Sequence, residues 1–415
     1  MKIAIIGSGI AGLTCAYLLA RRHDITVFEA DARVGGHTHT VPVTVDGREY
    51  AVDTGFIVFN DWTYPNFIRL LGQLGVAFKP TEMSFSVNDP DTGLEYNGNN
   101  LNSLFAQRSN LLSPGFWGML RDILRFNKEA RRDLAEQRIA ADTTLDDYLK
   151  AGGYGERFIL HYIVPMGAAI WSMPMAEMLN FPLQFFVRFF ENHGLLSVSN
   201  RPQWQVIEGG SSAYIAPLTA SFKERIRLNC PVGRIDRDAH GVVIHSPAGI
   251  ERFDKVVLAC HSDQALRLLG NPDDKEREIL GALPYADNEV VLHTDTRLLP
   301  TRKRAWASWN YRLGGAGHTR AAVTYDMNIL QGIQSDTTFC VSLNQSAGIT
   351  PSKVLARFTY AHPQFSLAAV TAQQRWAEID GAQHTHYCGA YWANGFHEDG
   401  VVSALRAAAA FGESL

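Results

Sequence analysis

Cysteine is scarce in this 415-residue chain, which contains only five. Neither a C-x-x-C pair nor the spacing of a metal-ligand set occurs among Cys15, Cys230, Cys260, Cys340 and Cys388. The chain has 14 histidines, but no suitably spaced Cys or carboxylate completes a zinc set around its close histidine pairs. We therefore expect no metal site, and we expect free thiols in a reducing compartment.

A basic run is also missing, and the net charge of −4 excludes nucleic-acid binding driven by overall charge. Residues 158–176 contain no Asp, Glu, Lys or Arg, but His161, Pro165 and Pro174 favour a buried or interfacial element over a membrane span. The N-terminus lacks the charged region and cleavage site of a signal peptide. We expect a cytoplasmic protein, with peripheral contact at the inner membrane face as an open alternative.

The most informative stretch lies near the N-terminus. Residues 2–6 form an apolar run, residues 7–12 are Gly-Ser-Gly-Ile-Ala-Gly, and residues 13–20 have a helical pattern. In such a G-x-G-x-x-G turn the first glycine permits the sharp bend, the second admits a diphosphate, and the third lets helix and strand pack closely. The helix N-terminus then offers its N–H groups to the phosphate. We predict a dinucleotide site that includes Gly7, Gly9, Ile10, Ala11 and Gly12.

An acidic residue supports the same site. A second apolar run, residues 25–28, ends in Glu29, which follows Gly12 at close to the roughly 20 residues expected for the acid that binds a ribose hydroxyl. We expect Glu29 and Ala30 at the ribose. A carboxylate at this point repels a 2′-phosphate, so NADP is disfavoured, and NAD or FAD remains.

A glycine doublet decides between these two cofactors. In Arg33-Val34-Gly35-Gly36-His37-Thr38 the doublet follows the acid and precedes polar residues. This pattern resembles the second phosphate-binding turn of FAD enzymes in the flavin-containing amine oxidase superfamily, which includes monoamine and polyamine oxidases, protoporphyrinogen oxidase and the phytoene desaturases. The resemblance implies FAD, with contacts at Arg33, Gly35, Gly36, His37 and Thr38. Most members have Arg where this chain has His37, so we expect a weaker, pH-dependent phosphate contact.

A β-hairpin is predicted next, from residues 41–45 and 49–52 around Asp46-Gly47. It leads into Asp53-Thr54-Gly55. In the superfamily an Asp-x-Gly at this distance returns the backbone to the flavin ring, which implies cofactor contacts at Gly55, Phe56 and Ile57. A hairpin followed by a turn that Asp53 caps is the alternative.

The end of the chain resembles the superfamily as well. A strand at residues 384–390 ends in Gly389-Ala390, and a helix at residues 401–410 follows Gly400. The superfamily points this helix N-terminus at the flavin, where it would stabilise the negative charge of the reduced form. Contacts are implied at Gly389, Ala390, Gly400 and Val401.

Three further residues are assigned by the same resemblance. A backbone contact of Val232 with adenine is implied within a run of strands at residues 226–259, although a plain β-meander gives the same pattern. Tyr391 and Trp392 fall where relatives place aromatic residues near the flavin face, and these two are our candidate catalytic-site residues. Ordinary core positions are the alternative for both.

Residues 101–149 have a helical pattern with two sides. The apolar side is predicted from Phe116, Trp117, Leu120, Ile123, Leu124 and Phe126, and the basic side from Arg121, Arg125, Lys128, Arg131 and Arg132. The basic side is either a solvated surface or a contact with an anionic membrane. The apolar stretch 158–190 either covers a substrate cavity, as the resemblance implies, or is core.

The remaining patterns complete the predicted fold. A helix is expected at residues 64–74, and residues 289–293, 305–311, 321–326 and 338–343 alternate like strands of a largely antiparallel sheet. Gly315-x-Gly317-x-x-Arg320 lacks the third glycine of a second fingerprint, so NAD(P)H is not expected as a second cofactor. We predict an α/β protein: a Rossmann-like FAD-binding domain (residues 1–80, 201–287 and 371–415) interleaved with an α+β substrate domain (residues 81–200 and 288–370), as in the amine oxidases.

The resemblance implies an FAD-dependent oxidoreductase that removes hydride from a small-molecule substrate and passes electrons to an acceptor the sequence does not identify. No familiar covalent attachment motif is visible, so FAD is expected to bind non-covalently. Amine oxidases usually carry a lysine on the strand that corresponds to residues 287–293, and this chain has none there.

The stretches Gly-Gly-His-Thr-His-Thr and Gly-Phe-His-Glu-Asp-Gly resemble a bacterial branch of predicted FAD-binding proteins related to fatty acyl desaturases. We therefore favour desaturation of an apolar acyl or isoprenoid-like chain. An amine or amino-acid oxidase and a non-catalytic FAD-binding protein are the two alternatives.

Overall fold

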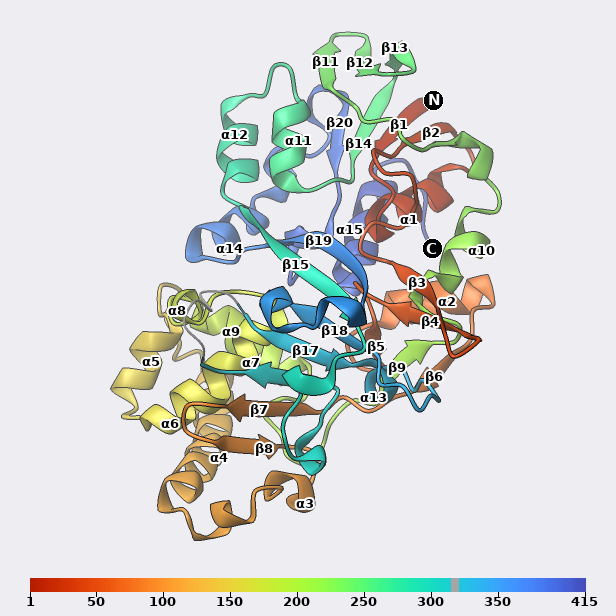
Figure 1. The fold of residues 1–415 in the computed structure, drawn as a ribbon. Helices are drawn as coiled ribbons and strands as arrows, with labels where there is room; N and C mark the ends of the chain where they lie inside the picture. Colours follow the sequence, from red (N-terminus) through yellow and green to blue (C-terminus); the bar gives the residue numbers. More distant parts are fainter. Residues whose placement is uncertain (315–320) are drawn as a thin grey trace.

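The computed structural model describes residues 1–314 and 321–415. The Gly315-x-Gly317-x-x-Arg320 stretch lies outside these residues. Figure 1 shows two main sheets, a parallel one in the upper part of the view and a larger one below it, with the helices of the first insertion gathered at the lower left.

The upper sheet has five parallel strands that come from three distant parts of the chain. Their spatial order is β10 (Ile226–Arg227), β2 (Asp24–Phe28), β1 (Lys2–Ile6), β14 (Lys255–Leu258) and β20 (Thr385–Tyr387). The central strand β1 is an almost continuous buried apolar run because helices cover both faces of such a sheet. The predicted Rossmann-like core with interleaved segments is confirmed.

Helix α1 (Ile10–Leu19) follows β1 directly and is buried on nearly all sides, which explains its lack of a polar face. It packs in one apolar cluster with α15 (His397–Ala409) and α2 (Pro65–Leu74). Burial of a side chain such as Leu13 contributes about 1.5–3 kcal/mol. The C-terminal helix begins at His397, earlier than the predicted Val401, because Asp399 accepts a hydrogen bond from the backbone N–H of Phe396 and caps it there.

Smaller sheets surround this core. The predicted hairpin is formed by β3 (Thr40–Val45) and β4 (Arg48–Asp53), and positive φ values at both Asp46 and Gly47 give its two-residue turn the primed geometry. The predicted strand run at residues 226–259 contains a meander of β11 (Arg234–Asp238), β12 (Gly241–Ser246) and β13 (Gly249–Phe253). Strands β5 (Val58–Asn60), β9 (Trp204–Ile207) and β6 (Phe78–Pro80) form a third small sheet.

The lower sheet has seven strands. Their order is β19 (Val354–Pro363), β15 (Tyr285–His293), β18 (Cys340–Leu343), β17 (Val323–Asp326), β16 (Trp309–Arg312), β7 (Phe85–Asp89) and β8 (Leu94–Asn97). The sheet is antiparallel except between β7 and β16. The strand predicted at 305–311 starts only at Trp309, because residues 303–305 form a 3-10 turn. The longest strand, β19, was not predicted.

The first insertion is mainly helical. It contains α3 (Leu101–Leu104), a 3-10 turn η1 (Arg108–Leu112), α4 (Pro114–Ala135), α5 (Leu145–Ala151), α6 (Glu156–Phe158), a π-helical turn η2 (Ile159–Ile163), α7 (Val164–Trp171), α8 (Met175–Met178) and α9 (Leu183–Asn192). Across the described part of the chain, no helix has both the length and the apolar character that crossing a membrane requires.

The predicted faces of α4 need correction. Phe116 and Phe126 are buried as expected, but Trp117 is 50% exposed and Leu124 is 57% exposed. At about 100° per residue, these two positions fall on the outer side of the helix together with basic residues.

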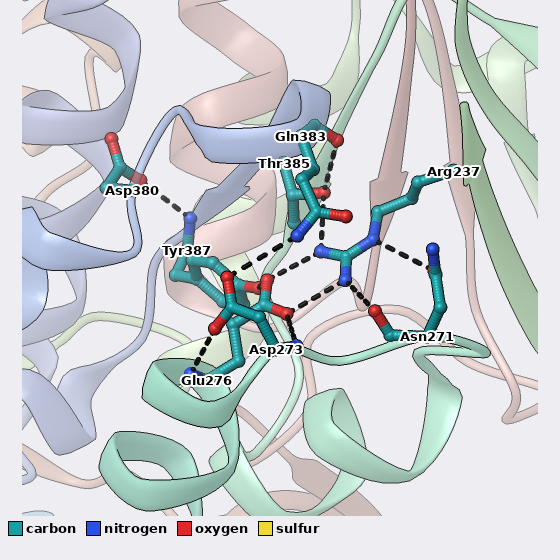
Figure 2. A network of polar contacts seen from close by, with 8 residues as sticks. All are labelled: Arg237, Asn271, Asp273, Glu276, Asp380, Gln383, Thr385 and Tyr387. Atoms are coloured by element: carbon teal, nitrogen blue, oxygen red, sulfur yellow. Dashed lines mark hydrogen bonds and ion pairs between the residues drawn. The ribbon is translucent and has the colours of Figure 1, made fainter. Parts of the chain in front are cut away.

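The remaining helices flank the two sheets: α10 (Ile215–Thr219), α11 (Ser262–Leu268), α12 (Asp274–Gly281), α13 (Met327–Leu330) and α14 (Leu367–Gln374). A buried polar network joins α12 to the meander and to β20 (Figure 2). Arg237 and Glu276 form a bidentate ion pair, and their side chains are 1% and 0% exposed. Nη1 and Nη2 of Arg237 donate to Oε1 and Oε2 of Glu276 at 2.5 and 2.8 Å. Tyr387 donates its hydroxyl to Glu276, and Arg237 also donates to the carbonyl of Asn271. The network therefore connects the second and third segments of the nucleotide-binding part.

Candidate functional site

A cavity of about 1050 Å³ is lined by residues of both main sheets. Most of the predicted cofactor residues lie on its wall: Gly7, Gly9, Ile10, Ala11, Glu29, Ala30, Arg33, Gly35, Gly36, His37, Gly55, Phe56, Ile57, Val232, Gly389 and Ala390. Tyr391 lines the same cavity. The fold thus brings together the predicted positions from the start, middle and end of the chain.

The N-terminus of α1 opens onto this cavity. Gly9 is its N-cap residue and has extended backbone geometry, and no described side chain caps the helix. The N–H groups of the first turn are therefore available to an anionic group. Glu29 stands beside them, held in place because the backbone N–H of Ser8 donates to its carboxylate at 2.9 Å.

The glycine doublet forms a tight turn next to this helix N-terminus. The N–H of Gly35 donates to the carbonyl of Ser8 at 2.9 Å, which fixes the turn to the first glycine loop. Arg33 folds back and donates to the carbonyls of Thr38 and Gly36 at 3.1 and 2.6 Å. A guanidinium therefore stiffens the turn and brings positive charge to it.

Four predicted cofactor residues lie behind the cavity wall instead of on it. Gly12 packs against the backbone of Gly7, and Thr38 makes a 2.6 Å hydrogen bond with the hydroxyl of Tyr214. Gly400 faces α1: a Cβ added there would lie 2.7 Å from the Cγ2 of Ile10. Its smallness lets α1 and α15 approach, and the fully buried Val401 packs in the same apolar cluster.

The two aromatic candidates, Tyr391 and Trp392, occupy different positions relative to the cavity. Tyr391 lines the cavity, whereas Trp392 packs with it in the apolar cluster beside β14, with ring centroids 5.0 Å apart. Trp392 therefore occupies a core position beside the cavity wall.

Several wall residues were not predicted. Tyr360 and His362 project from β19, His261 caps α11, and His39 follows the doublet. The rings of Tyr360, His362 and His261 lie 5.2, 5.4 and 6.0 Å from that of His37. The alternating residues Phe358, Tyr360 and His362 were the signal available in the sequence. Among the described residues no group of three or more His, Cys, Asp or Glu is arranged to hold a metal ion.

Burial keeps the imidazoles of His37 and His362 uncharged. It lowers the pKa of His37 well below its ordinary value, and the neighbouring His362 and His261 lower it further. The pKa of His362 falls to about 4 for the same reason, desolvation first and His261 second. At neutral pH these imidazoles are therefore hydrogen-bonding groups and carry no charge.

The proton on His362 is placed by a chain of amides. Asn344 accepts from the N–H of Glu289 and donates to the carbonyl of Ala321, which fixes its amide orientation. It then donates to Asn288 at 2.8 Å, and Asn288 donates to Nδ1 of His362 at 2.9 Å. Because Nδ1 must accept, the neutral ring carries its proton on Nε2.

Comparison with known proteins identifies the family of this fold. The model of the family described as flavin containing amine oxidoreductase matches residues 10–327. This chain belongs to that family. The L-amino-acid oxidase of Mus musculus is 25% identical over 317 residues, which cover 70% of this chain and 47% of that protein. The chain spans about half the length of the curated relatives it matches.

Solved structures show the fold of the amine oxidoreductase family over the whole chain. Cyclohexylamine oxidase from Brevibacterium oxydans has a TM-score of 0.69 at 16% identity and covers 99% of this chain and 98% of its own. A fatty acid isomerase from P. acnes has the same TM-score at 17% identity and covers 97% and 96%. The predicted amine oxidase-like architecture is confirmed.

The residues present fit FAD, the cofactor predicted for this family. A Cβ built on Gly9 meets no atom within 4 Å, so the wall is open where a diphosphate would approach α1. Nε2 of His37 is enclosed and has no hydrogen-bond partner among the described residues. On the same wall, burial raises the pKa of the Cys260 thiol to about 12, which disfavours the thiolate needed for covalent attachment.

The affinity for FAD is expected to depend on pH through His37. A bound diphosphate would raise the pKa of His37 above its lowered value in the free protein. The gain in affinity is then fully present below the free-protein pKa and is lost as pH rises through the bound-state pKa. Titrations of flavin fluorescence between about pH 5 and 8 should show this slope in the native protein and a flatter one in His37→Gln.

The control is His39→Gln, because Nδ1 of His39 bonds to the hydroxyl of Tyr360 and the residue is not expected at the diphosphate. Equal slopes in the native protein and His37→Gln would contradict the assignment of His37 to the phosphate.

Proposed function

We propose that this chain is an FAD-dependent oxidoreductase that removes hydride from an apolar substrate, with an acyl or isoprenoid-like chain as the substrate class. The flavin supplies the two-electron chemistry when it is bound. The chain's own residues bind the cofactor, exclude water and orient the substrate.

The composition of the cavity wall carries this proposal. Strands β16, β17 and β18, the helices α13 and α7, and the residue that follows α7 contribute only uncharged residues: Trp309, Tyr325, Leu343, Leu330, Ala169, Ile170, Trp171 and Ser172. A wall of this kind favours bulky apolar ligands. The charged residues of the lining come from other segments: Glu29, Asp31 and Arg33 after β2, Arg267 on α11 and Asp287 on β15. Glu29 and Arg33 are the two that were predicted to hold the cofactor.

Two polar groups on the uncharged wall suggest how a substrate is oriented. The indole N–H groups of Trp171 and Trp309 are enclosed and have no acceptor within residues 1–314 and 321–415. An orphaned donor in an apolar wall is stabilised by an acceptor on a ligand or a water. An ammonium group has no acceptor to offer, whereas a carbonyl or carboxylate does.

An oxidation assay tests the proposal. The FAD-loaded protein is mixed anaerobically with extracted phospholipids and isoprenoids and, separately, with a panel of amines. We expect the lipid mixture to bleach the flavin and mass spectrometry to find a product that has lost two hydrogens. Rapid bleaching by amines without any such lipid product would overturn the substrate class. The absence of bleaching by any reductant would favour the alternative of a non-catalytic FAD-binding protein.

Amine oxidation is the second candidate because the family model and several relatives concern amine or amino-acid oxidation. The observation against it is the sequence of β15, YADNEVVLH, which has no lysine on the strand where relatives usually carry one. The amine panel of the same assay decides between these two functions.

Removing one indole donor should change substrate affinity selectively. Trp309→Phe keeps an aromatic ring beside Tyr325, whose centroid lies 4.9 Å away, but deletes the N–H group. For substrates with a carbonyl or carboxylate we expect KM to rise about 5- to 10-fold, the worth of roughly one hydrogen bond, with little change in kcat. Steady-state kinetics with a hydrocarbon that lacks the acceptor is the control, and an equal rise in its KM would contradict the assigned donor role.

A further inference from the structure

The outer face of α4 carries a regular series of exposed apolar and basic residues. Trp117, Arg121, Leu124 and Lys128 follow one another at intervals of four, three and four residues, so they lie along one side of the helix. All four are exposed. Figure 1 places α4 at the lower end of the molecule, away from the nucleotide-binding sheet.

The turn before α4 extends the apolar part of this face. In η1, Leu111 is 46% exposed and Leu112 is 88% exposed. The indole N–H of Trp117 donates to the carbonyl of Leu111 at 2.9 Å, which fixes the turn against the helix. We name Leu111, Leu112, Trp117, Arg121, Leu124 and Lys128 the docking face.

The carboxylates of α4 lie on its other sides and are engaged there. Asp122 is buried and accepts from the backbone N–H of Gly155 at 2.9 Å. Glu129 accepts from the hydroxyl of Tyr154, and Asp133 accepts from the hydroxyl of Tyr148. The exposed stripe of the helix therefore contains no acid of its own.

The basic groups of the docking face are not neutralised. Arg121 and Lys128 form no ion pair with any residue that the structure describes, in contrast to Arg125, Arg131 and Arg132 on the same helix, which pair with carboxylates. The chain as a whole has a net charge of −4, so this basic surface is a local feature. Exposed leucines and a tryptophan beside unpaired cations match an anionic lipid surface, with phosphates for the cations and acyl chains for the apolar groups.

A second copy of the chain fits this face less well. In a symmetric pair the same patch meets itself, so Arg121 and Lys128 would approach like charges. An anionic bilayer offers opposite charge and no such repulsion.

We propose that the docking face binds the surface of an anionic membrane. Leu111, Leu112 and Trp117 enter the interfacial region, and Arg121 and Lys128 contact lipid phosphates. The inference goes beyond the proposed function, because none of the six docking-face residues lines the cavity. Membrane binding itself does not require turnover.

Vesicle co-sedimentation of the FAD-loaded protein tests this proposal. We expect binding to phosphatidylcholine vesicles that contain phosphatidylglycerol, weaker binding to pure phosphatidylcholine, and a loss of binding as salt is raised. The double variant Arg121→Gln with Lys128→Gln should lower the partition coefficient for anionic vesicles by roughly 30-fold. Each of the two basic residues accounts for about one order of magnitude or less of this factor. Leu112→Ser with Leu124→Ser should weaken it by at least about tenfold.

The matched control is Ile250→Ser, which removes an isoleucine that is 70% exposed on β13. It should bind vesicles as the native protein does. The proposal is overturned if the native protein does not bind anionic vesicles, or if the docking-face variants bind them as well as the native protein does. It is overturned as well if Ile250→Ser loses as much binding as the docking-face variants. It is also overturned if Leu112→Ser with Leu124→Ser abolishes self-association in sedimentation velocity while vesicle binding is absent. Because binding is read without substrate, a failed oxidation assay leaves this result unaffected.

Discussion

Gly9→Ala is expected to abolish tight FAD binding while the apoprotein keeps its fold. Gly9 has φ near −69°, which alanine adopts without strain, and an added Cβ meets no protein atom within 4 Å. The same methyl group would occupy the space through which a diphosphate approaches the N-terminus of α1. Overpacking of this kind costs about 1–3 kcal/mol, so we expect the Kd for FAD to rise roughly 5- to 150-fold. Fluorescence titration gives the Kd, and thermal unfolding of the apoprotein should be unchanged.

Gly12→Ala provides the contrast at the same turn. Its Cβ would lie 2.1 Å from the carbonyl oxygen of Gly7, a backbone atom that cannot move without disturbing β1 and α1. This variant should unfold at a lower temperature with or without FAD. If Gly9→Ala instead lowers the apoprotein melting temperature as much as Gly12→Ala does, or binds FAD normally, the site assigned at α1 is wrong.

Glu276→Leu should be among the most destabilising single changes in the chain. It leaves the guanidinium of Arg237 buried without its carboxylate and removes the acceptor of the Tyr387 hydroxyl. Breaking a buried pair in this way costs about 3–5 kcal/mol, a large share of a typical stability of about 5–15 kcal/mol. Urea denaturation followed by tryptophan fluorescence measures the loss.

Two companion variants separate the buried charge from simple loss of contact. Replacing Arg237, Glu276 and Tyr387 together by Met, Leu and Phe removes the buried charges and the buried hydroxyl, so most of the stability should return. Asp238→Asn breaks the ion pair with Arg252, in which both side chains are about half exposed, and should reduce the stability far less than Glu276→Leu does. A triple variant no more stable than Glu276→Leu would contradict the assigned cause.

Acid should weaken the native protein through the same network. Burial acts to raise the pKa of Glu276, but hydrogen bonds from Arg237 and Tyr387 outweigh burial and hold this pKa below its ordinary value. A depressed carboxyl pKa contributes stability that is present above the unfolded-state pKa and is lost as pH falls through the folded-state pKa. The companion triple variant lacks this dependence.

The sequence predicted the structure best where a backbone conformation depends on neighbouring residues alone. The glycines at residues 7–12 and 35–36 require particular turns, and these turns formed where they were predicted. Strand β19 is different, because its alternation of Phe358, Tyr360 and His362 indicates a strand but does not identify β15 as its partner. The histidine cluster around His37 depends on that pairing, so a linear pattern could not reveal it.

Two other differences have physical causes that the pattern could not show. The sequence gives Gly400 the features of a cofactor glycine, whereas the structure uses its missing side chain for the contact between α1 and α15. Trp117 and Leu124 were placed with the buried residues of α4 because they are apolar. Their exposure is visible only once the helix is seen against its neighbours.

Three distant segments of the chain form one parallel sheet, and this arrangement limits the order in which the sheet can form during synthesis. Strands β1 and β2 leave the ribosome first, but β14 gains its outer neighbour only when β20, at Thr385–Tyr387, has been made. Pairings across such separations are slow because loop closure must precede their stabilisation. The nascent nucleotide-binding half therefore carries an unpaired sheet edge through most of translation, and it depends on protection from aggregation until the last strand arrives.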